Sequence, residues 1–200
     1  DLTGLPGRAL LEQQIDELFD AESDDVVSLM FVDLDRFKPV NDSMGHAAGD
    51  RLLVLVADRM LEAVGTSGVV YRLSGDEFVV LASSLDDAEI EAIASRIRQT
   101  IRTPFELLGT EVYLSASVGY TTAAACDHDL LLSIIADADE AMFRSKQHGR
   151  DATTRFDVEM AMHRHCRLIA GIQHRGAERI LDPGATFTTP PALLAWSDAG

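Results

Sequence analysis

The sequence predicts an α/β sandwich, in which helices cover a central sheet of mixed or antiparallel strands. Short β-rich runs alternate with longer segments of helical periodicity as far as residue 154. Two of these runs, 69–73 and 78–81, flank a turn that contains Gly75, which is typical of a β-hairpin. A length of 200 residues with 46% hydrophobic content is sufficient for one buried core, so one globular domain is expected.

The order of the expected elements follows from apolar spacing, turn residues and helix caps. After an opening turn at 1–8 they are a helix over 10–19, a strand at 26–32, a short helix, a turn at 41–45, a helix over 52–61, the hairpin 69–81, a helix from a cap at Asp86 to about Arg102, a strand at 112–120 and a helix over 130–149. Beyond residue 154 a helix over 158–172 precedes segments broken by Pro and Gly.

Charge is distributed unevenly along the chain. The net charge is −16, and 28 of the 33 acidic residues but only 12 of the 17 Lys and Arg residues lie in 1–151. Because Lys and Arg dominate binding to phosphate backbones, a domain this acidic is not expected to bind DNA or RNA. If the domain binds a polyphosphate, cations must mediate the contact.

Signals for export or membrane insertion are not evident. The chain opens on Asp1 with no basic and apolar leader, and it has no apolar run of about 18 residues. Cys126 and Cys166 have neither metal-ligand nor disulfide spacing, which favours a reducing compartment. We expect a cytoplasmic protein without direct membrane insertion, which an N-terminal region outside this chain could tether to the inner membrane.

Carboxylates stand at the ends of two predicted strands. Asp33 and Asp35 follow the strand 26–32, and Asp76 and Glu77 occupy the hairpin turn. If the strands are adjacent, several carboxylates meet at one edge, where they either raise their pKa values or share a divalent cation such as Mg²⁺ or Mn²⁺. Two-metal phosphoryl-transfer sites have this arrangement. Each pair taken alone is more commonly a solvated strand end or an exposed turn.

Other polar residues carry weaker signals. His46 alone is more typical of a structural residue than of a catalytic one, and we expect it only to contact a ligand. The uneven spacing of His163, His165 and His174 does not favour a metal site. Ser74 and Ser117 have no accompanying His and Asp pattern that would predict a hydrolase triad.

Five motifs make the chain resemble the GGDEF family over about 1–156. They are Asp1-Leu-Thr-Gly-Leu-Pro-Gly-Arg8, Asp33-Leu-Asp-Arg-Phe-Lys-Pro-Val-Asn-Asp42, Gly45-His-Ala-Ala-Gly-Asp50, Arg72-Leu-Ser-Gly-Asp-Glu-Phe78 and Ala138-Asp-Glu-Ala-Met-Phe-Arg-Ser-Lys-Gln-His-Gly-Arg150. The motifs stand in the order and spacing of the family. The resemblance implies the palm-like fold of class III nucleotidyl cyclases, with a mixed or antiparallel five-stranded sheet flanked by helices.

The resemblance also implies a reaction. Diguanylate cyclases of this family condense two GTP molecules into cyclic di-GMP and two pyrophosphates. A homodimer is implied, in which each ribose 3′-hydroxyl attacks the α-phosphate of the neighbouring GTP, with two Mg²⁺ or Mn²⁺ ions at each half-site. An upstream sensory module, outside this chain, is implied as the source of regulation.

Site residues are carried over by position in the motifs. The implied metal ligands are Asp33, the Leu34 carbonyl, Asp76 and Glu77. Of these, Asp76 and Glu77 are the implied catalytic pair, with Glu77 placed to take the proton of the 3′-hydroxyl. The implied substrate ligands are Asn41 and Asp50 at the guanine edge, His46 beside the nucleotide, Gly75 in the signature turn, and Arg36, Phe37, Lys38, Lys146 and Arg150 around the phosphates.

Two positions depart from the family pattern. Ser74 stands where the first Gly of the signature is usual, and a positive φ there would strain the backbone by about 1–2 kcal/mol. We expect activity to survive this change. The segment 65–68, Gly-Thr-Ser-Gly, replaces an Arg-x-x-Asp motif that binds product in many relatives, so we expect no product inhibition through that site.

The segment 156–168 faintly resembles the linker that joins GGDEF domains to EAL phosphodiesterase domains, but no Glu-Ala-Leu motif follows it. We therefore expect a catalytic domain at 1–156, and a linker helix and irregular tail at 157–200 without phosphodiesterase chemistry.

Two other functions stay open: a catalytically weak GTP-binding regulatory module with the same fold, and a cyclase that uses ATP. The complete carboxylate set with Lys146 and Arg150 favours the diguanylate cyclase, and Asn41 and Asp50 favour GTP over ATP.

Overall fold

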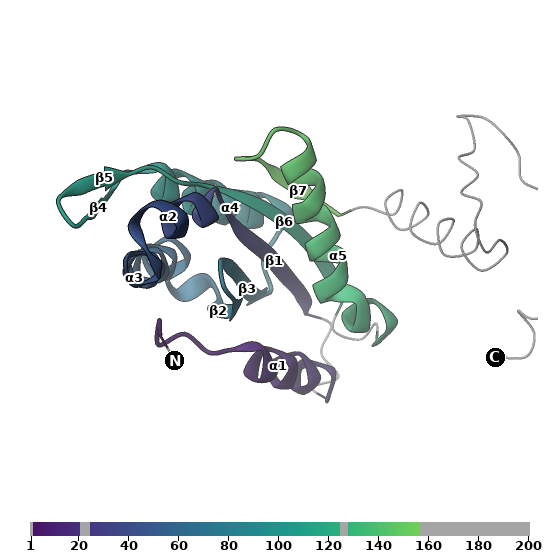
Figure 1. Cartoon of the computed structure of the whole chain (residues 1–200). Helices are drawn as coiled ribbons and strands as arrows, with labels where there is room; N and C mark the ends of the chain where they lie inside the picture. The colour runs from purple at the N-terminus through teal and green to yellow at the C-terminus, as the bar shows by residue number, and fades with distance from the viewer. Residues whose placement is uncertain (1, 21–24, 125–127, 157–200) are drawn as a thin grey trace, which may run out of the picture. The chain divides into compact units, whose positions relative to one another are not determined.

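A sheet of five strands lies between two layers of helices (Figure 1). The computed structural model describes residues 2–20, 25–124 and 128–156. In chain order the elements are α1 (Arg8–Asp20), β1 (Val26–Asp35), α2 (Phe37–Met44), α3 (His46–Val64), η1 (Gly65–Ser67), β2 (Val69–Ser74), β3 (Glu77–Ser83), α4 (Asp87–Arg102), β4 (Phe105–Leu107), β5 (Thr110–Val112), β6 (Ser115–Ala124), α5 (His128–Gln147) and β7 (Thr153–Arg155). The predicted linker helix and tail at 157–200 lie outside the described residues.

Strand β1 is the centre of the sheet, whose order is β2-β3-β1-β6-β7. It runs antiparallel to β3 on one side and to β6 on the other, while β7 joins the edge parallel to β6. The prediction of a mixed, five-stranded sheet flanked by helices is therefore confirmed. Because β1 has a neighbour on both sides, its backbone groups are paired, and every residue of the strand after Val26 is buried.

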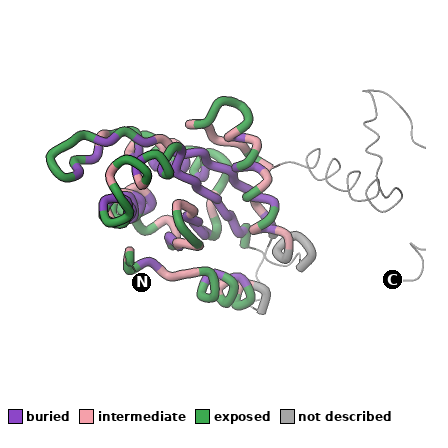
Figure 2. Tube along the Cα trace, in the orientation of Figure 1, coloured by how far each residue is buried: buried purple, intermediate pink, exposed green. Residues whose placement is uncertain are grey.

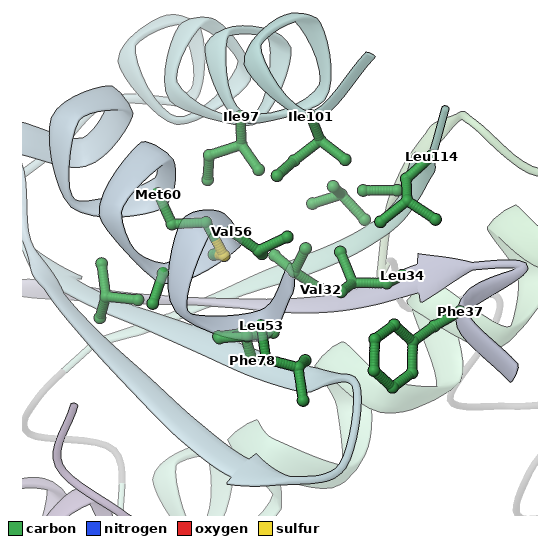
Figure 3. Close-up of a cluster of buried hydrophobic side chains, with 14 of the residues drawn as sticks. Val32, Leu34, Phe37, Leu53, Val56, Met60, Phe78, Ile97, Ile101 and Leu114 are labelled. Atoms are coloured by element: carbon green, nitrogen blue, oxygen red, sulfur yellow. The ribbon is translucent and has the colours of Figure 1, made fainter. Parts of the chain in front are cut away.

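The two faces of β1 belong to two separate cores, because successive side chains of a strand point to opposite faces. Even-numbered residues such as Val32 and Leu34 pack against α3 and α4, as Figure 3 shows. Odd-numbered residues such as Leu29 and Phe31 belong to the core under α1 and α5. The burial of the central strands contrasts with the exposed turn of the β4–β5 hairpin in Figure 2.

Helix α4 begins where the sequence predicts. Asp86 accepts a hydrogen bond from the amide of Glu89 at 2.8 Å, and the Glu89 carboxylate accepts one from the amide of Asp86 at 2.9 Å. This capping box pairs two backbone donors that a helix start leaves without partners. In the described parts of the chain, no helix combines the length and the apolar character needed to cross a bilayer.

Two predictions of local structure are wrong. The expected turn at 41–45 is helical as far as Met44, where α2 ends, because Gly45 at the C-cap, with a φ of 84°, breaks the helix by itself. The expected single strand at 112–120 is interrupted between Val112 and Ser115. Its first residue closes the short β4–β5 hairpin, and the rest belongs to β6.

Arg59 of α3 fixes the point at which α4 gives way to that hairpin. Its guanidinium donates hydrogen bonds to the carbonyls of Thr100 at 2.9 Å, Pro104 at 2.7 Å and Thr103. The same group stacks over the ring of Phe105, 3.7 Å from its centroid. A helix end leaves carbonyls without intrahelical partners, and this one side chain satisfies that of Thr100 together with the carbonyls of the two residues that follow the helix.

Helix α5 approaches β6 closely at Gly119. A Cβ at this position would lie 1.9 Å from the amide nitrogen of Met142, so only glycine allows the two backbones to meet. Near the end of the helix, the buried Ser145 hydroxyl donates to the carbonyl of Ala152 at 2.6 Å. These contacts position the last turn of α5, which carries Lys146, against the end of the sheet.

Two buried serines of the sheet test how much a hydrogen bond to a buried carboxylate contributes to stability. Ser28 is fully buried and its hydroxyl has no partner within the described structure, whereas the equally buried Ser117 donates to Asp35 at 2.9 Å. Replacement of Ser28 by Ala should leave the free energy of unfolding unchanged or raise it by up to about 1 kcal/mol, and Ser117→Ala should lower it by about 1.5–3 kcal/mol. Chemical denaturation of both variants measures the difference, and an equal loss in both would contradict it.

Candidate metal and nucleotide site

The two predicted pairs of carboxylates meet at one end of the sheet. The register of β1 and β3 sets Asp33 opposite Glu77, and the amide of Leu34 donates to the carbonyl of Asp76 at 3.3 Å. By strand alternation, Asp33 and Glu77 point to the face that α5 covers. The convergence of these acids, on which the sequence-based hypothesis depended, is present in the fold.

Lys146 of α5 lies against this group of acids. Its Nζ is 2.7 Å from Oδ2 of Asp33, whose side chain is only 11% exposed. Burial raises the pKa of Asp33, the hydrogen bond and charge of Lys146 oppose the rise, and the nearby carboxylates of Asp76 and Asp35 add to it. A carboxylate in these surroundings is stabilised in its charged form by added positive charge.

Asp35 is on the same face as Asp33 but has a different environment. It accepts hydrogen bonds from the hydroxyls of Ser115 at 2.8 Å and Ser117 at 2.9 Å, and from the amide of Asp151 at 3.1 Å. These donors satisfy both carboxylate oxygens of a residue that is 2% exposed. Asp35 therefore anchors β6 and the segment after α5, and only Asp33 faces the other acids.

Asp139 is an additional acid that the sequence analysis did not single out. Partial burial and the neighbouring Glu77 carboxylate raise its pKa, while Lys146 lowers it. Asp139 and Lys146 are seven residues apart on α5, so they lie on one face of the helix, two turns from each other. That spacing is the signal that could have assigned Asp139 to the site.

The signature turn is formed without strain at Ser74. Gly75 has the positive φ, 40°, and Ser74 does not, so the strain that we considered for Ser74 is absent. The Ser74 hydroxyl instead donates to Oε2 of Glu77 at 2.5 Å. Arg72 holds the turn from the other side, donating through Nε and Nη2 to the carbonyl of Gly75 at 3.1 and 2.9 Å.

The residues predicted to read guanine lie along α2 and the start of α3. Asn41 packs over Gly49, where a Cβ would lie only 1.8 Å from Oδ1 of Asn41. The absence of a side chain at Gly49 therefore makes the space that the amide of Asn41 occupies. Asp50, the next residue, and His46 are exposed at the same helix start, which leaves both free to contact a ligand.

The predicted phosphate ligands lie on both sides of the acids. Arg36 has a left-handed φ of 64° and caps α2, so the first amides of that helix begin at Phe37, directly after β1. Such amides lack intrahelical partners and favour anions. The Lys38 side chain is exposed, and that of Arg150 is 58% exposed with its Nε 3.7 Å from Oδ1 of Asp35.

The donor atoms at this edge suit a hard divalent cation. Asp33, Asp76 and the Leu34 carbonyl offer oxygen ligands of the kind that Mg²⁺ prefers. The ammonium of Lys146, bound to Asp33, already occupies the place of a cation beside these acids. Within the ranges that the structure describes, no three His, Cys, Asp or Glu side chains form a ready cluster for a metal. Mg²⁺ commonly completes its coordination with waters and substrate phosphates.

Comparisons with curated proteins identify relatives along most of the chain. PdeR of Escherichia coli K12, named a cyclic di-GMP phosphodiesterase, is 40% identical over 159 residues, which are 80% of this chain and 24% of PdeR. MucR of Pseudomonas aeruginosa, named a bifunctional diguanylate cyclase and phosphodiesterase, is 34% identical over 80% of this chain and 24% of its own. The chain thus spans about a quarter of the length of these relatives. The diguanylate cyclase DgcN of E. coli K12 is 34% identical over 77% of this chain and 38% of its own.

Solved structures agree with the sequence relatives. The GGDEF domain of YfiN from P. aeruginosa has a TM-score of 0.71 at 33% identity, and the match covers 78% of this chain and 99% of that domain. The sequence profile of the family described as "Diguanylate cyclase, GGDEF domain" matches residues 1–152. The palm-like fold expected from the sequence is confirmed, and the chain belongs to the GGDEF family.

Proposed function

We propose that this chain is a diguanylate cyclase domain that condenses two GTP molecules into cyclic di-GMP and two pyrophosphates. The observation that carries the proposal is the convergence of Asp33, Asp76 and Glu77 beside Lys146, where the central strand β1 ends and β3 begins. Phosphoryl transfer needs little covalent chemistry from a protein and depends on positioning and on stabilisation of charge, which this arrangement can provide. In this proposal the domain occupies 1–156, and 157–200 form a linker and tail.

Asp33, Asp76 and the Leu34 carbonyl would hold two Mg²⁺ ions, with Glu77 as an additional ligand. When bound, these ions would neutralise phosphate charge and favour loss of the proton from the attacking 3′-hydroxyl. The chain itself would bring the acids together before any ion arrives, because the β1–β3 register fixes them. Lys146 would then be released from Asp33 toward the phosphates.

Recognition of GTP would come from α2, α3 and the end of α5. Asn41 offers an amide and Asp50 a carboxylate, which match the carbonyl and the N1 and N2 donors of guanine. His46 would contact the nucleotide, and Gly75 would let it approach the turn, since no atom lies within 4 Å of a Cβ there. The amides after Arg36, with Lys38, Lys146 and Arg150, would hold the β- and γ-phosphates.

Glu77 is the proposed acceptor of the 3′-hydroxyl proton. The Ser74 hydroxyl binds Oε2 of Glu77, which leaves Oε1 for the proton and restricts the rotamers of the side chain. One site holds one GTP, so the attack on an α-phosphate requires a second copy of the domain facing the first. Holding two reactants in line can lower the barrier by about 7–11 kcal/mol in favourable cases, so an upstream module could regulate the rate through the dimer.

A GTP-binding regulatory module is the second candidate. It is favoured by the 40% identity to PdeR, which is named for phosphodiesterase activity, whereas this chain belongs to the GGDEF family. The presence of Asp33, Asp76, Glu77 and Lys146 together favours the enzyme, because binding alone has no need of a proton acceptor. A cytoplasmic location, where GTP is available, is part of the same proposal.

Turnover of GTP separates these candidates. With Mg²⁺, the purified chain should convert GTP but not ATP to a cyclic dinucleotide, identified by mass spectrometry, with specific activity that rises with protein concentration because two domains must meet. Asp76→Ala should lower the rate at least about a hundredfold, as expected for loss of charge stabilisation at the reacting phosphate. Asp16→Ala, which removes an exposed acid on α1, is the matched control. A wild-type protein that binds GTP without forming product would support the regulatory module instead.

Competition between Lys146 and a divalent ion can be measured without nucleotide. Lys146→Met removes the ammonium beside Asp33, so Mg²⁺ should stabilise this variant more than the wild type. At ten times its dissociation constant a ligand raises the free energy of unfolding by about 1.4 kcal/mol, which denaturation at several Mg²⁺ concentrations detects. The double variant with Asp33→Asn should lose this response. An identical response in the single and double variants would place the ion elsewhere.

Addition of cyclic di-GMP tests the absence of product inhibition. The segment 65–68 offers neither a guanidinium nor a carboxylate, so turnover of GTP should be unaffected by cyclic di-GMP apart from simple competition. Initial rates at several GTP concentrations give this result directly. A strong loss of rate that excess GTP does not reverse would show that another surface binds the product.

A further inference from the structure

The segment that follows α5 has an unusual backbone. Gly149, Arg150 and Asp151 all have positive φ, with values of 116°, 64° and 48°. Within the described residues, no other pair of consecutive non-glycine residues is left-handed. This conformation costs about 1–2 kcal/mol for each non-glycine residue, and Asp tolerates it better than Arg does. Contacts elsewhere must therefore hold Arg150 in this state.

Asp151 makes the contacts that hold the segment. Its amide donates to Oδ2 of the buried Asp35 at 3.1 Å, which ties the segment to β1. Its carbonyl accepts a hydrogen bond from Nη2 of Arg98, and its Oδ2 accepts one from Nε of Arg102 at 2.5 Å. Nε of Arg98 also lies 3.5 Å from Oδ1 of Asp151. Two arginines of α4 thus fix both the backbone and the carboxylate of one residue.

The contacts of Asp151 also fix the backbone of Arg150, and with it the position from which the Arg150 side chain extends. Asp35, with 1% of its side chain exposed, is held by two serine hydroxyls and lies 3.7 Å from Nε of Arg150. More than half of the Arg150 side chain, 58%, is exposed to solvent. Its guanidinium is therefore restrained near its base and available to a ligand beyond it.

We propose that Asp151, held by Arg98 and Arg102, is a positioning residue that orients Arg150 toward the triphosphate of the bound nucleotide. This inference rests on the proposed function, because it assigns Arg150 to the phosphates. An arginine that is already oriented loses less conformational freedom on binding and can bind a phosphate through two parallel hydrogen bonds. Helix α4, which supplies no residue to the acidic edge, acts on the site through Asp151.

A double-mutant cycle tests the proposal. The affinity of the chain for a GTP analogue with a methylene bridge between the α- and β-phosphorus atoms is measured by calorimetry with Mg²⁺. Asp151→Ala and Arg150→Ala should each weaken binding about tenfold, and the double variant should be no weaker than the weaker single variant, because both act through the same guanidinium. Multiplicative losses in the double variant would overturn the proposal.

A matched control for Asp151→Ala is available on α4, the helix that carries Arg98 and Arg102. Asp87, the first residue of α4, forms an ion pair with Arg155 at 2.5 Å and lies about three turns of helix before Arg98, so Asp87→Ala should leave the affinity unchanged. An equal loss in this variant would mean that the affinity reports general stability, which overturns the role of Asp151. Arg98→Ala with Arg102→Ala, which keeps Asp151 itself, should repeat the loss seen for Asp151→Ala.

Amide hydrogen exchange gives a readout that is independent of the nucleotide. The amide of Asp151 should exchange faster in the Arg98→Ala and Arg102→Ala double variant than in the wild type and in Asp87→Ala, and unchanged protection would overturn the proposal. If the chain binds the analogue but does not turn over GTP, the proposed cyclase activity is refuted. The double-mutant cycle of Asp151 and Arg150 still decides the role of Asp151 in that case. A wild-type protein that binds no analogue would refute both.

Discussion

The antiparallel register of β1 with β3 and β6 is the constraint on which the rest of the site depends. It sets Asp33 opposite Glu77 on one side and opposite Ser117 on the other. Charged groups are costly to bury, so a strand that is apolar through most of its length and ends in carboxylates must bring partners to that end. The partners are the hydroxyls of β6 and the last turns of α5. They arrive there because β6 pairs with β1 in the sheet, while α5 packs on the face to which Asp33 and Asp35 point.

The two aspartates of β1 show how far sequence patterns can identify a site. Asp33 and Asp35 both follow the apolar run 26–32, two residues apart, and so share one face of the strand, and only the position of Asp33 in the family motif assigned it to a metal. The structure explains the difference in physical terms. Both carboxylate oxygens of Asp35 accept hydrogen bonds from hydroxyls and an amide, with Arg150 beside them, whereas Asp33 has one ammonium and other acids around it. The spacing of Asp139 and Lys146 indicates a shared helix face, but the meeting of that face with Glu77 depends on how α5 packs, which no local pattern of the sequence encodes.

Elements with a strong local signal were predicted correctly, and those without one were not. The capping box at Asp86 and the hairpin around Gly75 are encoded by neighbouring residues, so they could be predicted from the sequence alone. Strands β4, β5 and β7 have three residues each, which is too short for alternation to be recognised. They exist because neighbouring strands and Arg59 hold them in place, which is information from the packing of distant residues.

The alternation of β1 also determines which changes of sequence the domain can accept. A substitution within the strand alters one side chain, whereas insertion or deletion of a single residue before Val32 would exchange the two faces beyond that point. Val32 and Leu34 would then stand where carboxylates meet α5, and two carboxylates would enter the core under α3 and α4. Length is therefore more strictly constrained than composition in this strand, while the β4–β5 turn, which lies at an exposed rim, can lengthen without such a penalty.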